Sequence, residues 1–171
     1  MRPAKVSDAA ALAELQAASM ERTLRAALAA EISNATRAML DTDDFARTWA
    51  GTIGRLKPSQ DVLVALNNQG VLGFLAGDVV ATPERELVYS ISTFELSEAG
   101  QAAGVGEALL GYVARKAEKN WSEAVLIWLF AGDDATTSMF SAAGFEPAGA
   151  SREFEIDGQK LSQHLWRKDL L

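Results

Sequence analysis

The stretch Gln101-Ala102-Ala103-Gly104-Val105-Gly106 lies where one kind of secondary structure is expected to give way to another. Before it, residues 86–96 are rich in β-branched and aromatic side chains and predict a strand. After it, residues 106–119 repeat apolar side chains at helical spacing and predict a helix. The first turn of a helix carries backbone N–H groups without intrahelical partners and the positive end of the helix dipole. The stretch is therefore a candidate binding site for an anion such as a phosphate.

The composition narrows the class of protein. The chain has 171 residues, of which 49% are hydrophobic and 23% charged, which predicts one globular domain over residues 1–171. A formal net charge of −7 and a pI of about 4.8 argue against a nucleic-acid partner, which usually meets a basic face. With no cysteine and one histidine, His164, thiolate and histidine-cluster metal sites are excluded, and no metal is expected. The longest apolar run, residues 124–131, is shorter than the roughly 20 residues of a spanning helix, so a cytoplasmic protein without membrane contacts is expected.

The remaining segments alternate between helical and strand patterns. A strand stub is expected within residues 1–6, helices over residues 9–18, 21–39 and 41–56, and a hairpin of residues 61–66 and 71–80. Residues 124–130 are apolar on both faces and predict a central strand, followed by a short helix near residues 133–140 that Gly144 ends. Residues 151–156 and 160–168 predict a last hairpin. This order predicts an α/β (α+β) domain around one mixed sheet.

Three phosphate-binding motifs can be compared at the glycine-rich stretch. A Walker loop needs Gly-Lys-Ser/Thr, which the sequence lacks. The Rossmann fingerprint needs a third glycine, where this chain has Leu109, so a Rossmann-type nucleotide binder is disfavoured. The pattern Q/R-x-x-G-x-G/A is met in full by Gln101, Gly104 and Gly106.

This pattern and its surroundings resemble the GNAT superfamily of acyl-CoA-dependent N-acetyltransferases. Residues 127–134 and 139–145 resemble the strand and helix that follow the loop in that family, and residues 62–75 resemble its early hairpin. Arg2-Pro3-Ala4 with Asp8 resembles a common opening. The resemblance covers nearly the whole chain and implies a mixed, mostly antiparallel, twisted sheet with helices on both faces. It also implies transfer of an acetyl group from acetyl-CoA, the co-substrate, directly to an amine of a small molecule or protein in a ternary complex.

The resemblance further implies where acetyl-CoA binds. The loop would hold the diphosphate, the strand before it would bind the pantetheine arm, and the thioester would lie where this strand separates from residues 124–130. The residues assigned in this way are Phe94, Leu96, Gln101, Ala102, Ala103, Gly104, Val105, Gly106, Asp133 and Phe140.

Three residues of the strand before the loop are candidates for catalysis. Glu95 and Glu86 are candidate bases for the amine proton, and Tyr89 is a candidate acid toward the leaving thiolate. Each also has a structural interpretation, since a strand carboxylate can simply be solvated and a strand tyrosine can be packed in the core. The net charge of −7 favours a cationic or amine-bearing acceptor, and a homodimer is left open as the assembly.

The sequence departs from the family pattern at three places. The loop has no Arg or Lys and is flanked by Glu98 and Glu107. Asp133 stands where the family often has asparagine, and Phe140 stands where it often has the tyrosine that protonates the thiolate. Several alternatives follow: Tyr89 or Ser141 acts as the acid, the thiolate leaves without a side-chain acid, or the domain binds CoA or a partner without acyl transfer.

Overall fold

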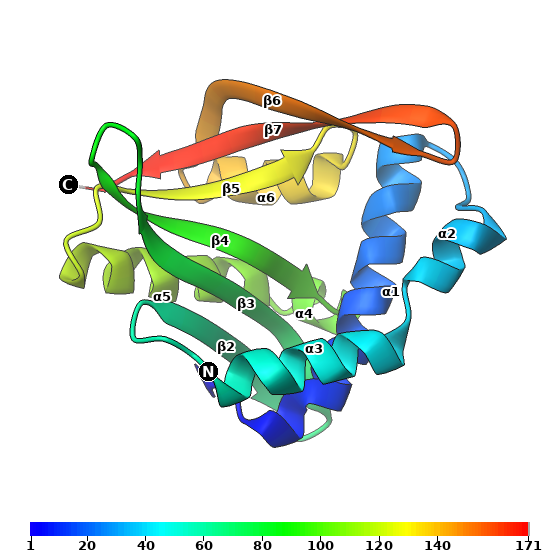
Figure 1. The fold of residues 1–171 in the computed structure, drawn as a ribbon, viewed down its shortest axis with the longest axis horizontal. Helices are drawn as coiled ribbons and strands as arrows, with labels where there is room; N and C mark the ends of the chain where they lie inside the picture. The colour runs from blue at the N-terminus through cyan, green and yellow to red at the C-terminus, as the bar shows by residue number, and fades with distance from the viewer. Residues whose placement is uncertain (171) are drawn as a thin grey trace.

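A seven-stranded sheet of order β1-β2-β3-β4-β5-β7-β6 forms the centre of the computed structural model, which describes residues 1–170 (Figure 1). All neighbouring strands are antiparallel except β4 and β5, which confirms a mixed, mostly antiparallel sheet. The strands are β1 (Arg2–Pro3), β2 (Gln60–Asn67), β3 (Gly70–Ala81), β4 (Leu87–Leu96), β5 (Ala124–Phe130), β6 (Glu146–Ile156) and β7 (Gln159–Asp169).

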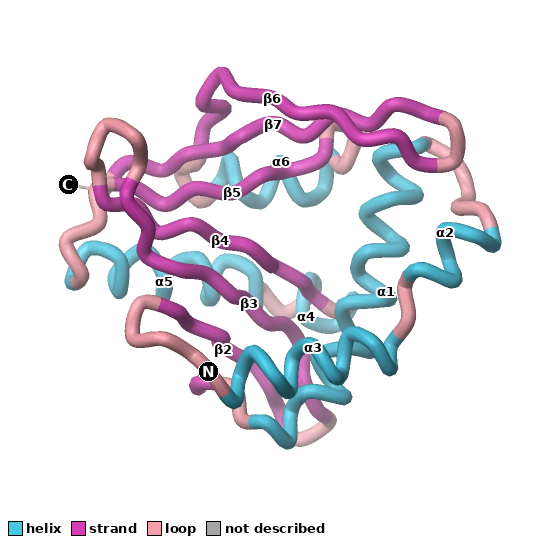
Figure 2. The backbone as a smooth tube through the Cα atoms, in the orientation of Figure 1, coloured by secondary structure: helices cyan, strands magenta, loops and turns pink. Residues whose placement is uncertain are grey.

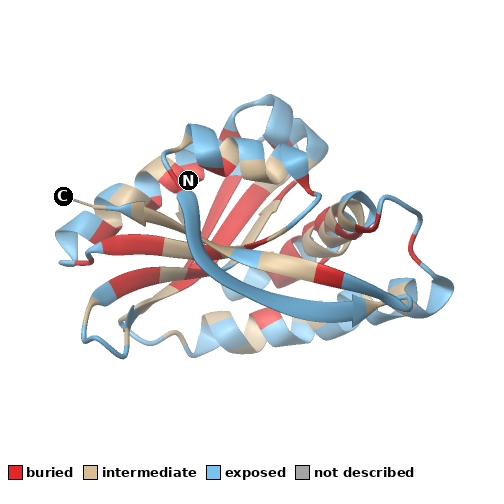
Figure 3. Ribbon diagram, turned by 90° about the horizontal axis from the view of Figure 1, so that it is seen from above, coloured by how far each residue is buried: buried red, intermediate tan, exposed pale blue. Residues whose placement is uncertain are grey.

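Helices cover both faces of the sheet, as the resemblance implied (Figures 1 and 2). Leu12 of α1 and Trp49 of α3 pack with Phe74 in one buried cluster. Leu109 of α5 and Phe140 of α6 pack against the opposite face in a larger cluster. Figure 3 shows the buried residues concentrated in the strands between these layers. The helices are η1 (Val6–Asp8), α1 (Ala9–Leu28), α2 (Asn34–Met39), α3 (Thr42–Gly54), α4 (Glu98–Ala102), α5 (Val105–Lys119) and α6 (Asp134–Ala142).

The expected division of the first helical region near residues 19–20 is wrong. Helix α1 continues without a break to Leu28, because its alanine-rich sequence favours helix and contains neither Gly nor Pro. It ends where Ala29 adopts the left-handed conformation, with φ of 53°. Helix α2 begins after Ser33, whose side chain accepts a hydrogen bond from the Thr36 N–H.

The connection between β4 and α5 also differs from the expected direct turn. Its first part forms the short helix α4, which Ser97 caps by accepting a hydrogen bond from the Gly100 N–H. The glycine-rich stretch therefore begins inside α4 and crosses to α5 at Gly104, which has φ of 72°. This left-handed conformation is one that glycine adopts readily.

A β-bulge in β4 decides which side chains face the site. Ala76 pairs with Thr93 and Gly77 pairs with Ile91, so one extra residue of β4 lies between these two pairs. Ile91 and Phe94 therefore both face α5, although they are three residues apart. By the same alternation, Glu95 points to the opposite face, toward α1.

Strands β4 and β5 separate halfway along their length. They pair only from Val88 with Ala124 to Ile91 with Ile127. Beyond this point β4 keeps its pairing with β3, and β5 keeps its pairing with β7. The central sheet therefore opens at this place, in agreement with the separation that the resemblance implied.

We expect Gly77→Ala to destabilise the protein by about 1–3 kcal/mol, the usual cost of overpacking a core. A Cβ at Gly77 would lie 2.4 Å from a ring carbon of Tyr89, whose side chain is fully buried and cannot easily move away. Gly51→Ala is the matched control, because a Cβ there meets nothing within 4 Å and alanine favours the interior of α3. Urea unfolding of both variants measures the difference, and a Gly77→Ala variant as stable as the wild type would contradict this packing.

Candidate active site

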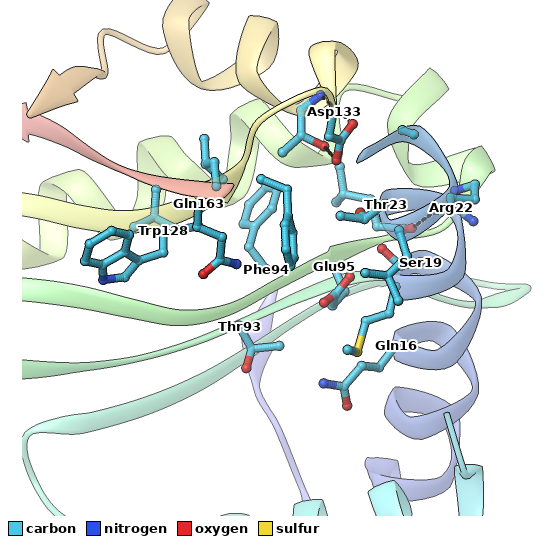
Figure 4. A pocket seen from close by; sticks show the side chains of 18 of the residues that line it. Gln16, Ser19, Arg22, Thr23, Thr93, Phe94, Glu95, Trp128, Asp133 and Gln163 are labelled. Atoms are coloured by element: carbon cyan, nitrogen blue, oxygen red, sulfur yellow. Dashed lines mark hydrogen bonds between the residues drawn. The ribbon is translucent and has the colours of Figure 1, made fainter. Parts of the chain in front are cut away.

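A cleft of about 1310 Å³ lies where β4 and β5 separate (Figure 4). Its walls come from β4 between Ser90 and Leu96, from the last half of β5, from α1 and α2, and from the β6–β7 hairpin. Gln101 and Glu107, near the start of α5, line the same cleft. The cleft therefore connects the α1 side of the sheet with the start of α5.

The start of α5 has the properties of an anion site. Among residues 1–170, no side chain caps this helix by a hydrogen bond. The N–H groups of its first turn are thus left for a ligand, and the helix dipole favours negative charge there. At Gly106 the absence of a side chain allows close packing on α6, since a Cβ there would lie 2.3 Å from the sulfur of Met139. The residues present therefore fit a diphosphate held mainly by backbone donors.

The charges around this helix start are mixed. A carboxylate oxygen of Glu107 would lie 3.7 Å from a Cβ built on Gly104, so one acidic side chain is folded toward the candidate anion site. Arg22 of α1 lies at this end of β4, because it donates a hydrogen bond to the carbonyl oxygen of Leu96. Arg22 also lines the cleft, so it partly offsets the missing basic residues of the loop.

Glu95 is the cleft carboxylate with the most altered acidity. Burial raises its pKa to about 7, and the negative charge of Asp133 acts in the same direction. The Ser19 hydroxyl and the Arg22 guanidinium, both from α1, oppose this change. Figure 4 shows the Glu95 side chain directed into the space in front of α1. A carboxylate with a pKa near neutrality in a cleft is suited to accept a proton.

The structure does not bring Tyr89 and Phe140 to the cleft. Tyr89 is fully buried and its hydroxyl donates to Oδ2 of Asp61 at 3.3 Å, while burial raises its pKa above the usual value. Phe140 is also fully buried, with ring centroids 5.0 Å from Phe94 and 5.1 Å from Phe145. Their placement gives no support to an acid role for Tyr89 or to a direct cofactor contact for Phe140. Both are core residues.

The other residues proposed from the sequence are placed in two groups. Phe94, Glu95, Leu96, Gln101 and Asp133 line the cleft. The second group forms the connection from α4 to α5 and consists of Ala102, Ala103, Gly104, Val105 and Gly106.

Asp133 and Glu86 have structural partners of their own. Asp133 is 7% exposed and caps α6, and its carboxylate accepts hydrogen bonds from the Thr136 hydroxyl at 2.7 Å and the Thr136 N–H at 3.4 Å. Glu86 lies just before β4 and pairs with Arg167, which holds the pKa of Glu86 below its usual value. Glu86 is thus an ion-pair partner, away from the cleft.

Sequence reasoning missed several polar residues of the cleft. Ser19 and Arg22 come from α1, and Trp128, Arg152 and Gln163 come from β5, β6 and β7. No local pattern marks them, because they meet only when the chain folds. Among residues 1–170, His, Asp and Glu side chains form no group of three or more that could hold a metal ion. No helix in that range is long and apolar enough to cross a membrane.

Comparisons with known proteins bear on the fold. No family model matches the sequence, and no curated protein matches it. The N-acetyltransferase PaiA from Thermoplasma acidophilum, solved in complex with coenzyme A, has a TM-score of 0.75 and 15% identity over 98% of this chain and 96% of its own. YncA from Salmonella typhimurium, solved with its cofactor acetyl-CoA, has a TM-score of 0.70 and 20% identity over 99% of this chain and 92% of its own. An acetyltransferase of the GNAT family from Streptococcus pneumoniae has a TM-score of 0.69 and 18% identity over 99% of this chain and 98% of its own. The chain therefore has the fold of the GNAT N-acetyltransferases.

Proposed function

We propose that this protein is an N-acetyltransferase that moves an acetyl group from acetyl-CoA to an amine of a small molecule or protein by direct transfer in a ternary complex. The observation that carries this proposal is one cleft that joins the uncapped start of α5 to the buried carboxylate of Glu95. A site for a phosphate-bearing donor and a base for an amine thus share one space. Two of the structures with the same fold contain coenzyme A or acetyl-CoA, which supports the choice of donor.

Backbone groups would hold most of the donor. The first-turn N–H groups of α5 would bind the diphosphate, and glycine at position 104 permits the turn that directs them. Beyond Ile91, β4 is not paired with β5, so the N–H and C=O groups on that edge are available to the pantetheine arm, except the Leu96 carbonyl, which accepts a hydrogen bond from Arg22. Phe94 and Leu96 lie on this unpaired part of β4 and line the cleft.

The chain supplies the proton acceptor. Bound acetyl-CoA would supply a thioester, whose acetyl carbon forms a bond to the amine nitrogen as its bond to sulfur breaks and sulfur leaves as a thiolate. Glu95 would take the proton that the amine loses, directly or through a water molecule. No tyrosine, lysine or histidine is among the residues of the described chain that line the cleft, so no side-chain acid is assigned to the thiolate.

The absence of such an acid favours one alternative, a domain that binds CoA or a partner without acyl transfer. Phe140 has no proton to give and is buried away from the cleft, as is Tyr89. Ser141, the other candidate from the sequence, is exposed on α6 and does not line the cleft. The placement of Glu95 supports the enzyme, since its carboxyl lies in the cleft with its pKa raised to about 7.

Thermal unfolding with and without acetyl-CoA tests the proposal. A ligand at about 100 times its Kd that binds only the folded state should add roughly 2.7 kcal/mol of stability. Release of free CoA is then measured across a panel of primary amines. No thermal shift at millimolar acetyl-CoA would contradict the proposed function. A shift without release of free CoA in the presence of any amine would favour a domain that binds CoA without acyl transfer.

A further inference from the structure

Arg152 of β6 lines the cleft, and two neighbouring contacts orient its guanidinium. The guanidinium carbon lies 4.4 Å from the centre of the Trp128 ring and 5.3 Å from that of Phe154. Its Nε donates a hydrogen bond to Oε1 of Gln163 at 2.7 Å. Contact with an aromatic face and one hydrogen bond together limit how the side chain can turn.

The outer donors of this guanidinium have no partner in the described chain. Among residues 1–170, no carboxylate forms an ion pair with Arg152. The carboxylate of Asp157 also lines the cleft, but it accepts hydrogen bonds from the Ser33 N–H at 2.8 Å and the Thr36 hydroxyl at 2.6 Å. Arg22, the other cation of the cleft, donates to a backbone carbonyl. Arg152 is therefore the lining cation whose Nη groups are free.

Arg152 and Glu95 lie on the same side of the sheet. The neighbours of Trp128 in β5, Ile127 and Leu129, are buried in the cluster under α5, so Trp128 faces the opposite side. Arg152 contacts the ring of Trp128 and shares that side. Glu95 points to it as well, because of the bulge in β4. The start of α5 belongs to the other side, so Arg152 is not placed to bind the diphosphate of the donor.

We propose that Arg152 binds a carboxylate of the acceptor, so that the acceptor is an amine that also carries a carboxylate, such as an amino acid. This rests on the proposed function, in which the amine end meets Glu95. A planar guanidinium with two free donors matches a carboxylate through two parallel hydrogen bonds. The net charge of −7 alone favours cationic acceptors, but charges farther apart than about 8 Å are largely screened at physiological salt, whereas a carboxylate bound to Arg152 would contact its guanidinium directly.

Matched acceptors and variants test this assignment. CoA release is measured with amino acids and with the corresponding amino-acid carboxamides, which keep the amine and side chain and lose the negative charge. Arg152→Gln should lower the preference for acid over amide, as a ratio of kcat/KM values, by about 10- to 100-fold, mainly through KM. Comparing the same two substrates in both enzymes cancels the different basicity of their amines. Arg152→Lys, which keeps the charge but not the planar fork, should have an acid-to-amide ratio between those of the wild type and Arg152→Gln.

The matched control is Arg115→Gln, which removes one positive charge from an exposed position of α5 that does not line the cleft. It should leave the acid-to-amide ratio at the wild-type value. A second readout needs no turnover: with CoA present, an amino acid should raise the Tm of the wild type more than that of Arg152→Gln. Peptides with a free C-terminus and free amino acids are compared in the same assay to separate these two sources of the carboxylate.

Two results would overturn the assignment. One is an equal loss of kcat/KM for acid and amide in Arg152→Gln; the other is the same amino-acid thermal shift, or none, in both proteins. These are distinct from failure of the proposed function, in which acetyl-CoA gives no thermal shift and no amine releases CoA. If the carboxamides are acetylated and Arg152→Gln leaves the acid-to-amide ratio unchanged, the proposed function is supported and only the role of Arg152 is contradicted.

Discussion

Gly104→Glu should abolish the binding of acetyl-CoA, with a loss in affinity of about 100-fold or more. Gly104 precedes the uncapped first turn of α5, and its φ of 72° is disfavoured for residues with a side chain. A carboxylate added here would compete for the N–H groups that are expected to bind the diphosphate. It would also repel the diphosphate together with Glu107, whose carboxylate already lies nearby. Titration calorimetry with acetyl-CoA measures the change in Kd.

Two further variants separate charge from backbone strain. Gly104→Asn tolerates a positive φ and adds no charge, so it should keep the wild-type affinity within a few-fold. Gly104→Ala should lower the free energy of unfolding by about 1–2 kcal/mol, the cost of a left-handed alanine, with a smaller change in Kd than the glutamate variant. An unchanged Kd in a folded Gly104→Glu protein would mean that the start of α5 is not the diphosphate site.

The features of the fold that the sequence predicts well are those set by a few neighbouring residues. Asp157 and Gly158 form the two-residue turn of the last hairpin with φ of 55° and 73°, as their residue types indicate. Gly144 ends α6 with φ of 92°, and the Phe145 N–H bonds to the carbonyl of Phe140 at 3.0 Å. In both cases the chain adopts a conformation that its local sequence favours strongly.

Longer-range features escape this reasoning. The bulge in β4 has no mark in the sequence of β4 itself, since it depends on the pairing with β3 around Gly77. Strict alternation without the bulge would place Tyr89 and Glu95 on the same face of the sheet. With it, Tyr89 lies in the core and Glu95 in the cleft. Arg152 and Trp128 meet for a similar reason, because they are far apart in sequence and are brought together through β7.

Glu95→Gln should lower kcat by about 10²- to 10⁴-fold, the usual contribution of a general base, while acetyl-CoA affinity stays close to the wild type. In the wild type, kcat/KM should fall about tenfold per pH unit below pH 7, because burial raises the pKa of Glu95 to about 7 and the protonated acid cannot accept a proton. The glutamine variant should lack this pH dependence. Glu155→Gln is the matched control, since Glu155 also lines the cleft but is exposed on β6. A wild-type rate in Glu95→Gln would remove Glu95 from the mechanism.

Glu95→Gln should raise the stability of the protein above neutral pH, although it lowers activity. The pKa of Glu95 is raised in the folded protein from 4.5 to about 7, so the folded state favours the protonated form. Its contribution to stability is complete below pH 4.5 and is lost as the pH rises through 7, where the buried carboxylate must carry a charge. Glu95→Gln should therefore be more stable than the wild type at pH 8, by at most about 3 kcal/mol, and the difference should shrink toward pH 5. Thermal melts across this pH range measure it. A variant that loses both activity and stability at pH 8 would identify Glu95 as a structural residue, whereas lost activity with gained stability is the result expected of a carboxylate kept in the cleft for catalysis.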